Sequence, residues 1–279
     1  MKALSKLLAL STLLMSPLTT SRAADVPQKS LPLPGEVFLV QGRTAFVILP
    51  SVRPAARPVP WVWYAPTLPN LPGTAEKWMF ERFTQAGIAI AGIDAGESYG
   101  SPDGQALYSA LYDELTKRRG FSPKAVMLGR SRGGLMTLAW AVKNADKVAG
   151  FAGIYPVCNV ASYPGVEKAS GAYRLTADEF AKRLAEHNPI DRLAALAKAG
   201  VPLFAIHGDS DMVVPLDANS GEMRKRYEAL GGKMQLIVSP GQGHNMWTGF
   251  FRCQALVDFV MAITGKPVAA AASPMPRSI

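Results

Sequence analysis

Short apolar runs alternate with longer segments of helical spacing along most of this chain. Runs with the length and composition of strands lie at 37–40, 45–49, 61–64, 88–93, 125–128, 151–155, 201–206 and 234–238. Segments with apolar residues at helical spacing lie at 75–85, 106–118, 135–142, 177–186, 191–199, 216–230 and 254–263. Residues 88–93 are apolar throughout, as expected for a strand that is covered on both faces. The pattern predicts an α/β fold with a mainly parallel central sheet and helices on both faces.

The length suits one such domain, which we expect to span residues 24–264. The first two strands are close enough to form a hairpin at Gly42, at the edge of the sheet. Residues 156–200 depart from the alternation and carry a Gly/Pro/Tyr-rich stretch, so we interpret them as an insertion that can form a lid. Residues 265–279 are rich in alanine and proline, and we expect a disordered C-terminal tail there.

Residues 1–23 have the pattern of a secretory signal peptide. Lys2 and Lys6 precede a short apolar run at 7–14, and Ser21-Arg22-Ala23 fits a small-x-small cleavage site. The apolar run is too short for a membrane anchor, which needs about 20 apolar residues. We therefore expect a secreted or periplasmic protein with no membrane span in its mature chain.

The composition narrows the classes of function. The chain is 48% hydrophobic and 18% charged, with a formal net charge of +9. Its basic residues are scattered and form no stripe interleaved with aromatic residues, which argues against nucleic-acid binding. The histidines are not spaced with one another or with cysteine as metal ligands, so no metal site is expected. Cys158 and Cys253 can pair in an oxidising compartment or serve as small core residues, and the sequence leaves both this and the oligomeric state open.

The strongest chemical signal is the stretch Leu128-Gly129-Arg130-Ser131-Arg132-Gly133-Gly134. It lies between an apolar strand and a buried helix, which is the context of the G-x-S-x-G nucleophile elbow. In so tight a turn the serine backbone is strained, and neighbours with a Cβ collide with the strand and the helix. The turn is expected to hold the Ser131 hydroxyl above the sheet edge, at a helix N-terminus that favours developing negative charge.

A serine nucleophile needs a base, and the base needs an acid that orients it. Two loops follow strands at the same edge of the sheet, one with Asp209 and Asp211 and the other with His244. Side chains two residues apart on an extended tip share a face, so both aspartates are candidates for the acid. His207 precedes a glycine at a strand end and is interpreted as a buried structural residue, while His187 is interpreted as a helix-end residue.

Three motifs together resemble the α/β-hydrolase superfamily, above all its esterase and prolyl-oligopeptidase-like branches. They are the elbow at 129–133, H-G-x-x-D-x-x-V-P at 207–215 and Gly243-His244, and the likeness covers about residues 61–263. The resemblance implies Ser131 as nucleophile, His244 as base, and Asp211 rather than Asp209 as the orienting acid. It also implies acyl transfer that needs no cofactor.

The oxyanion hole departs from the pattern of this superfamily. Many members carry H-G-G-G after the strand that here ends at Tyr64, but this chain has Ala65-Pro66-Thr67. Pro66 has no N–H, so Thr67 is the candidate donor, together with the N–H of Arg132. The elbow also matches the G-x-S-R-x-G frame of glucuronoyl esterases, which implies that the Arg132 guanidinium contributes to the oxyanion hole. The alternative is an arginine held in an ion pair on the elbow helix.

We therefore expect a secreted serine hydrolase that cleaves a carboxylic ester, with a small-molecule or carbohydrate-linked ester as its substrate. Four aromatic residues in or near the loops above the sheet are candidate substrate-binding residues: Trp63, Tyr99, Tyr163 and Trp247. The alternative for each is that it fills the core. Two other functions stay open, a peptidase of the prolyl-oligopeptidase type and a non-catalytic binding protein on a hydrolase scaffold.

Overall fold

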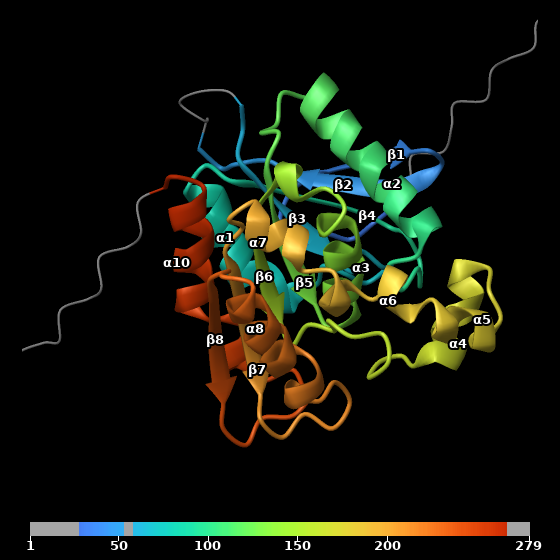
Figure 1. Ribbon diagram of the computed structural model, residues 1–279. Coiled ribbons are helices and arrows are strands. Elements are labelled where there is room, and N and C mark those ends of the chain that lie inside the picture. Colours follow the sequence, from blue (N-terminus) through green and yellow to red (C-terminus); the bar gives the residue numbers. More distant parts are fainter. Residues whose placement is uncertain (1–27, 53–57, 267–279) are drawn as a thin grey trace, which may run out of the picture.

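The computed structural model describes residues 28–52 and 58–266 of the chain. The predicted signal peptide and the predicted tail beyond residue 266 lie outside these residues. The described part is a central sheet with helices on both faces (Figure 1), which confirms the predicted α/β fold. Within these two ranges, no helix is long and apolar enough to cross a membrane.

A sheet of eight strands runs through the described part, in the order β1-β2-β4-β3-β5-β6-β7-β8. The strands are β1 Glu36–Val40, β2 Arg43–Ile48, β3 Trp61–Ala65, β4 Ala89–Ile93, β5 Ala125–Arg130, β6 Val148–Ile154, β7 Leu203–Gly208 and β8 Met234–Ser239. β1 and β2 form the predicted antiparallel hairpin at one edge, and β2 pairs antiparallel with β4. The remaining neighbours pair in parallel, so the loops that follow these strands meet at one edge of the sheet.

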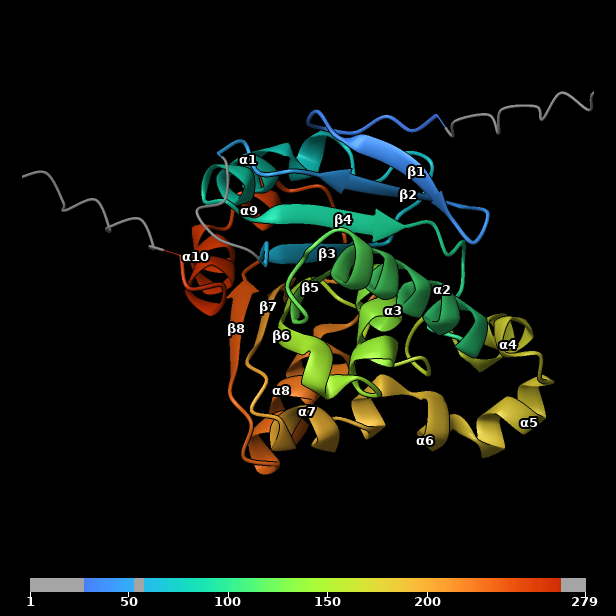
Figure 2. The ribbon, with the colours of Figure 1, turned by 90° about the horizontal axis from the view of Figure 1, so that it is seen from above.

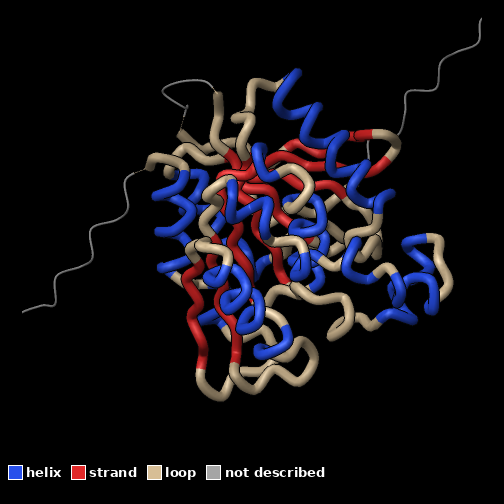
Figure 3. Tube along the Cα trace, in the orientation of Figure 1, coloured by secondary structure: helices blue, strands red, loops and turns tan. Residues whose placement is uncertain are grey.

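Helices cover the two faces of the sheet in separate groups (Figure 2). One face carries α1 Lys77–Gln85, α9 Thr248–Phe251 and α10 Gln254–Ile263. The other face carries α2 Pro102–Asp113, α3 Arg132–Ala141, α7 Ala194–Lys198 and α8 Ser220–Ala229. Figure 3 shows the strands in the middle of the described part with helices around them. The buried side chains of the strands belong to two apolar clusters, one on each face of the sheet.

The apolar runs of the sequence explain this two-sided core. Along β5, Ala125 and Met127 belong to the apolar cluster on one face, and Val126 and Leu128 belong to the cluster on the other. All four side chains have no exposed surface. Burial of a large aliphatic side chain contributes about 1.5–3 kcal/mol, so the middle strands anchor both layers.

Several helices differ from their predicted bounds. α2 begins at Pro102, four residues before the predicted start, because the Ser101 hydroxyl caps it and accepts a hydrogen bond from the Gly104 N–H at 3.4 Å. Proline suits the first helical position, where its missing N–H is not needed. The predicted helix at 177–186 is instead two short helices with a break at Arg183.

The predicted insertion contains α4 Val166–Ser170, α5 Ala177–Lys182 and α6 Leu184–His187. These helices lie together at one end of the molecule in Figures 1 and 3. Tyr173 and Phe180 of the insertion join an apolar cluster with Tyr99 and Leu135, which attaches the insertion to the loop after β4 and to α3. Its role as a lid stays a prediction.

Both cysteines are free thiols in the structure. Cys158 is buried and Cys253 is half-buried. Of the two possibilities left open by the sequence, a disulfide and small core residues, the structure shows the second. Burial raises the pKa of both thiols, which keeps them in the unreactive protonated form at neutral pH.

Candidate active site

Ser131 lies in the sharp turn between β5 and α3, as the elbow motif predicts. Its backbone has φ +49° and ψ −125°, a conformation that residues with a side chain rarely adopt. The Ser131 N–H donates to the Ile154 carbonyl at 3.0 Å, and the Ser131 carbonyl accepts from the Val157 N–H at 2.8 Å. These bonds to the end of β6 hold the strained turn in place.

The glycines of the elbow permit close packing of α3 on the sheet. A Cβ on Gly133 would lie 2.0 Å from the carbonyl oxygen of Ala65, at the end of β3. A Cβ on Gly129 would lie 2.6 Å from the Cα of Gly134. Each distance is far inside van der Waals contact, so only glycine allows the nucleophile turn to pack against β3 at this distance.

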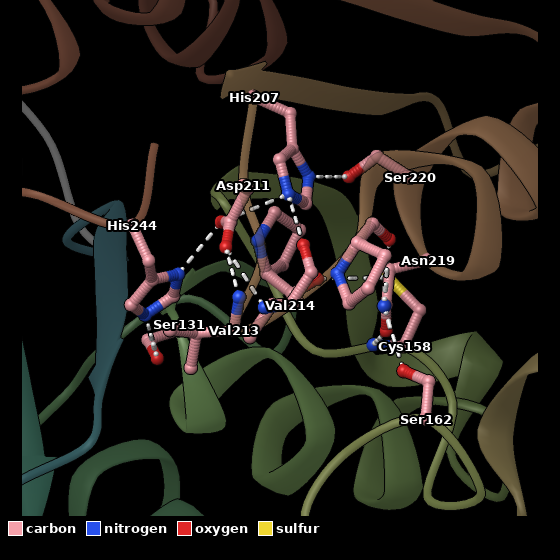
Figure 4. Close-up of polar contacts among 12 residues, drawn as sticks. Ser131, Cys158, Ser162, His207, Asp211, Val213, Val214, Asn219, Ser220 and His244 are labelled. Atoms are coloured by element: carbon pink, nitrogen blue, oxygen red, sulfur yellow. Dashed lines mark hydrogen bonds and ion pairs between the residues drawn. The ribbon is translucent and has the colours of Figure 1, made fainter. Parts of the chain in front are cut away.

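His244 comes from the loop after β8, and its ring reaches Ser131. Its Nδ1–H donates to Asp211 Oδ2 at 2.7 Å, and its Nε2 accepts from the Ser131 hydroxyl at 2.7 Å (Figure 4). Because a carboxylate can only accept, this arrangement leaves Nε2 free to take the serine proton. The ring packs against Tyr155 with 4.4 Å between centroids. The three predicted side chains are therefore hydrogen-bonded in the order that acyl transfer requires.

Asp211 is buried and its carboxylate is surrounded by donors. Its Oδ1 accepts from the N–H groups of Val213 at 2.9 Å and Val214 at 2.8 Å. Burial by itself would raise the pKa of Asp211, but the hydrogen bonds from His207, Val214 and His244 outweigh it and lower the pKa to about 2. The carboxylate is therefore ionised at any pH at which a histidine can act as a base.

His207 is fully buried, as predicted, and it also contacts the acid (Figure 4). Its Nε2–H donates to the Val214 carbonyl at 2.8 Å, and the same nitrogen lies 3.3 Å from Asp211 Oδ2. Its Nδ1 accepts from the Ser220 hydroxyl at 2.8 Å. This contact with Asp211 was not predicted, because a histidine at a strand end gives no sign in the sequence of what its ring touches.

Asp209 makes different contacts. It is exposed, and its Oδ1 accepts from the Ser210 hydroxyl at 2.9 Å and from the Gly241 N–H at 2.8 Å. These bonds tie the loop of the acid to the loop of His244. Of the two candidate aspartates, Asp211 is the one that contacts the imidazole.

Asn219 fixes the loop of the acid to the segment that follows β6. Its Oδ1 accepts from the Cys158 N–H at 2.9 Å, and its Nδ2 donates to the Ser162 hydroxyl at 2.8 Å (Figure 4). The amide is fully buried, so both ends of this bridge are shielded from water.

A cavity of about 190 Å³ opens beside Ser131. Its lining residues are Pro66, Leu71, Arg130, Ser131, Arg132, Tyr155, His244, Asn245 and Met246. Arg132 is the first residue of α3, so its N–H has no acceptor within the helix and is available as an oxyanion donor. Among the described residues, no group of three or more His, Cys, Asp or Glu side chains is placed to hold a metal ion.

The side chain of Thr67 does not belong to this lining. Its Oγ1 donates to the Tyr64 carbonyl at 3.3 Å and lies over Gly92, where a Cβ would approach it to 2.4 Å. The threonine is buried between β3 and β4, and only its backbone N–H stays a predicted oxyanion donor.

The predicted substrate-binding role of Trp63 is wrong. The Trp63 side chain has no exposed surface and packs between Trp61, Tyr108 and Trp140, with ring centroids about 5 Å apart. A strand that is apolar on both faces buries its aromatic residues, and Trp63 fills the core.

The other three predicted aromatic residues lie outside the lining of the cavity. Tyr99 is buried, and its carbonyl accepts from the Tyr173 hydroxyl at 2.8 Å. Tyr163 packs against the apolar cluster that contains Tyr99 and Tyr173. Trp247 is 43% exposed on the loop of His244, so it is accessible to a bound molecule.

The Arg132 guanidinium forms an ion pair with Glu97, from the loop after β4. Both side chains are partly exposed and Arg132 also lines the cavity, so the pair stands at its rim. The sequence analysis left two roles open for the Arg132 guanidinium, a contribution to the oxyanion hole and an ion pair on the elbow helix. The structure contains the ion pair, and Arg132 follows Ser131 directly in the chain.

Arg130 is a cavity residue that the sequence analysis missed. It lies in an ion pair with Glu76, with 2.8 Å between Nη1 and Oε1, and the Glu76 side chain is fully buried. The signal is present in the sequence, because Arg130 continues the register of the core residues Val126 and Leu128 on the same face of β5. A charged residue in that register predicts a buried partner.

Comparison with known proteins identifies the family of the chain. The model of the prolyl oligopeptidase family matches residues 108–262, which contain Ser131, Asp211 and His244. No curated protein matches the chain.

Solved structures with the same fold include peptidases and esterases. A puromycin hydrolase is 19% identical with a TM-score of 0.65, and the match covers 85% of this chain and 40% of that one. Est1E from Butyrivibrio proteoclasticus is 17% identical with a TM-score of 0.60, over 83% of this chain and 99% of that one. A truncated carbohydrate esterase from gut microbiota is 18% identical with a TM-score of 0.60, and the match covers 80% of this chain and 91% of that one. The chain thus spans about two fifths of the length of the puromycin hydrolase.

Proposed function

Since this chain belongs to the prolyl oligopeptidase family and is a serine hydrolase, we propose that it cleaves a carboxylic ester through Ser131, His244 and Asp211. The observation that carries the proposal is the unbroken series of hydrogen bonds from Ser131 through His244 to the ionised Asp211. In this series the carboxylate orients the imidazole, and the imidazole takes the proton of the serine hydroxyl.

In the proposed reaction, His244 Nε2 takes the Ser131 proton as the hydroxyl oxygen attacks the ester carbonyl. The tetrahedral oxyanion then receives a hydrogen bond from the Arg132 N–H, at the positive end of α3. His244 returns the proton to the leaving alcohol, which leaves an acyl group on Ser131. Water that is activated by the same imidazole releases the acid.

An ester is the preferred substrate because a carbohydrate esterase is among the solved structures that share this fold. Trp247, exposed beside the His244 loop, supports a carbohydrate-linked ester, since its ring offers a flat surface to a sugar. The alternative is a peptidase of the prolyl-oligopeptidase type.

We further propose that the protein is secreted or periplasmic. The proposal depends on the pattern of residues 1–23, with Lys2, Lys6 and the cleavage-site sequence Ser21-Arg22-Ala23. Expression of the full chain with N-terminal sequencing of the exported product tests it: a mature protein that begins at Ala24 supports export, and an uncleaved protein retained in the cytoplasm contradicts it.

The test of the catalytic proposal is a panel of short acyl esters, sugar acetates, uronate methyl esters and proline peptides. Wild type and Ser131→Ala are compared on each substrate. We expect Ser131→Ala to lose ester hydrolysis and to keep the melting temperature of wild type, because the hydroxyl contributes little to packing. Faster cleavage of proline peptides than of any ester would favour the peptidase. Wild-type activity in Ser131→Ala would exclude the proposed nucleophile.

A further inference from the structure

Two arginines flank the nucleophile, and both line the cavity beside Ser131. Their carboxylate partners, Glu76 and Glu97, are not part of the lining. A group inside the cavity can therefore contact both guanidinium groups but neither of these two carboxylates. Coulomb energy falls with distance, so a bound anion would gain more from the guanidinium groups than it would lose to Glu76 and Glu97.

Arg130 is held rigidly by a buried cluster. Glu76 accepts from Arg130 Nη1 at 2.8 Å, from the Tyr64 hydroxyl at 2.8 Å and from the Gly73 N–H at 2.9 Å. The guanidinium also lies 5.0 Å above the ring of Phe251. Because the arginine is already fixed in one conformation, binding a group to it does not require ordering a long side chain.

The second terminal nitrogen of Arg130 is directed toward a weak acceptor. Its Nη2 lies 2.9 Å from the thioether sulfur of Met246. A thioether accepts hydrogen bonds poorly, whereas a carboxylate forms a short, charge-assisted bond with a guanidinium. Met246 is 56% exposed, so it can move aside when a stronger acceptor arrives.

We propose that Arg130 binds a carboxylate that the ester substrate carries close to its scissile bond. The inference rests on the proposed ester hydrolysis and names the class of substrate: an ester with a free acid group in its acyl or its alcohol part. The Glu76 cluster positions the guanidinium, and Arg132, which also lines the cavity, adds a second positive charge.

Matched pairs of esters test this inference, because each pair differs only in charge. For the acyl side, ethyl hydrogen succinate is compared with ethyl succinamate. For the alcohol side, acetoxyacetate is compared with acetoxyacetamide. We expect kcat/KM of wild type to be at least tenfold higher for the acid in one pair, and to fall toward the amide value as salt screens the charge.

The variant Arg130→Met would leave Glu76 as a buried unpaired charge, so it is combined with Glu76→Gln. The double variant should lose at least tenfold in kcat/KM on the preferred acid and change less than threefold on its amide. Arg130→Lys should retain part of the preference, since a point charge replaces the fork. Arg118→Met, which removes an exposed arginine that also forms an ion pair, from the helical turn Glu114–Arg118, is the matched control and should leave the preference unchanged.

Inhibition by the free acid gives a readout that needs no variant to fold. Succinate or glycolate should inhibit cleavage of a simple acetate ester by wild type competitively and at least tenfold more strongly than the matching amide. Equal rates on acid and amide in both pairs, with equal inhibition, would overturn the inference and leave the proposed function intact. Failure of wild type to cleave any ester would overturn the proposed function and the inference together.

Discussion

Two aspartates only two residues apart have separate tasks at the candidate site. Asp211 lies under the imidazole of His244 and accepts hydrogen bonds with both carboxylate oxygens, while Asp209 closes the turn between two loops. Both residues carry the same chemical group, so their tasks differ because Asp211 is buried against His244 and Asp209 is exposed. The same substitution at each position therefore compares the two tasks directly.

Asp211→Asn should reduce kcat far more than Asp209→Asn. An amide at Asp211 favours the wrong tautomer of His244, and such a change costs up to about 10⁴-fold in turnover. Asp209→Asn weakens a turn and should cost less than tenfold. Steady-state kinetics on the best ester measures both, with melting temperatures as the control. A larger loss in Asp209→Asn would mean that the acid is assigned to the wrong carboxylate.

Removal of His207 should slow the reaction although His207 does not touch the serine. His207→Phe keeps the ring volume and removes one of the donors to the buried Asp211 carboxylate. A hydrogen bond to a charged group contributes about 1.5–3 kcal/mol. If the bond from His207 stabilises the transition state by this amount, its loss lowers kcat about 10- to 100-fold.

His207→Gln separates positioning from folding, since its amide nitrogen can reach the place of Nε2. It should recover part of the rate that His207→Phe loses. A lower melting temperature of His207→Phe with an unchanged kcat would show that the residue only supports the fold.

At the residue scale, sequence motifs predicted the residues whose positions depend on their own loops. They did not predict residues whose positions depend on contacts with distant parts of the chain. Ser131, Asp211 and His244 stand in sequence patterns that specify their loops, and all three meet in the structure. The place of Trp63 depends on Tyr108 and Trp140, which pack against it from two other elements. No local pattern contains those contacts, so its burial could not be distinguished from exposure in a loop.

At the scale of elements, the elbow depends on the distance between α3 and β3. Gly133 lies against the carbonyl of Ala65, and any side chain there must push the nucleophile turn away from the end of β3. The predicted oxyanion donors, Arg132 and Thr67, belong to α3 and to the segment after β3, so the separation of the two elements should affect the chemistry as well as the packing.

Gly133→Ala should therefore reduce both stability and activity. A Cβ at 2.0 Å from a carbonyl oxygen cannot be accommodated without a backbone shift, and overpacking of this kind costs about 1–3 kcal/mol. Gly171→Ala is the matched control, because its backbone is helical and its Cβ would meet no atom within 4 Å. Urea unfolding and kcat of both variants give the comparison. Wild-type kcat in Gly133→Ala would show that the elbow tolerates a wider spacing.

The strands were the most predictable elements, and the helix boundaries were the least. β3, β4 and β5 are buried on both faces, so uninterrupted apolar runs marked them. The start of α2 depends on a cap by Ser101 and on Pro102, which lie before the apolar pattern begins. α9 is a single turn of four residues, too short to show a helical period.

At the scale of the whole molecule, a two-sided core holds the loops of the site at one edge of a parallel sheet. The elbow follows β5, the loop of the acid follows β7, and the loop of His244 follows β8. Asp209 accepts a hydrogen bond from Gly241 and connects the loop of the acid to the loop of His244, and Asn219 accepts one from Cys158, in the segment after β6. The geometry of the site is thus a property of the assembled fold, and the energy of its charged groups contributes to global stability.

Asp211 should make the folded protein less stable in acid. Its pKa is about 2 in the folded protein, against about 3.9 for an unfolded chain. A carboxyl group whose pKa is lowered by folding adds stability above its unfolded pKa, and this contribution disappears as the pH falls through the folded pKa. The full contribution is about 2.6 kcal/mol, and about 1 kcal/mol of it should vanish between pH 6 and pH 3. Asp211→Asn cannot titrate, so the difference in unfolding free energy between wild type and this variant should shrink by that amount over the same interval. Urea unfolding of both proteins at pH 6, 5, 4 and 3 measures it. A difference that is constant with pH would mean that Asp211 has the same affinity for protons in the folded and unfolded chains, which is incompatible with its buried hydrogen bonds to His207, Val214 and His244.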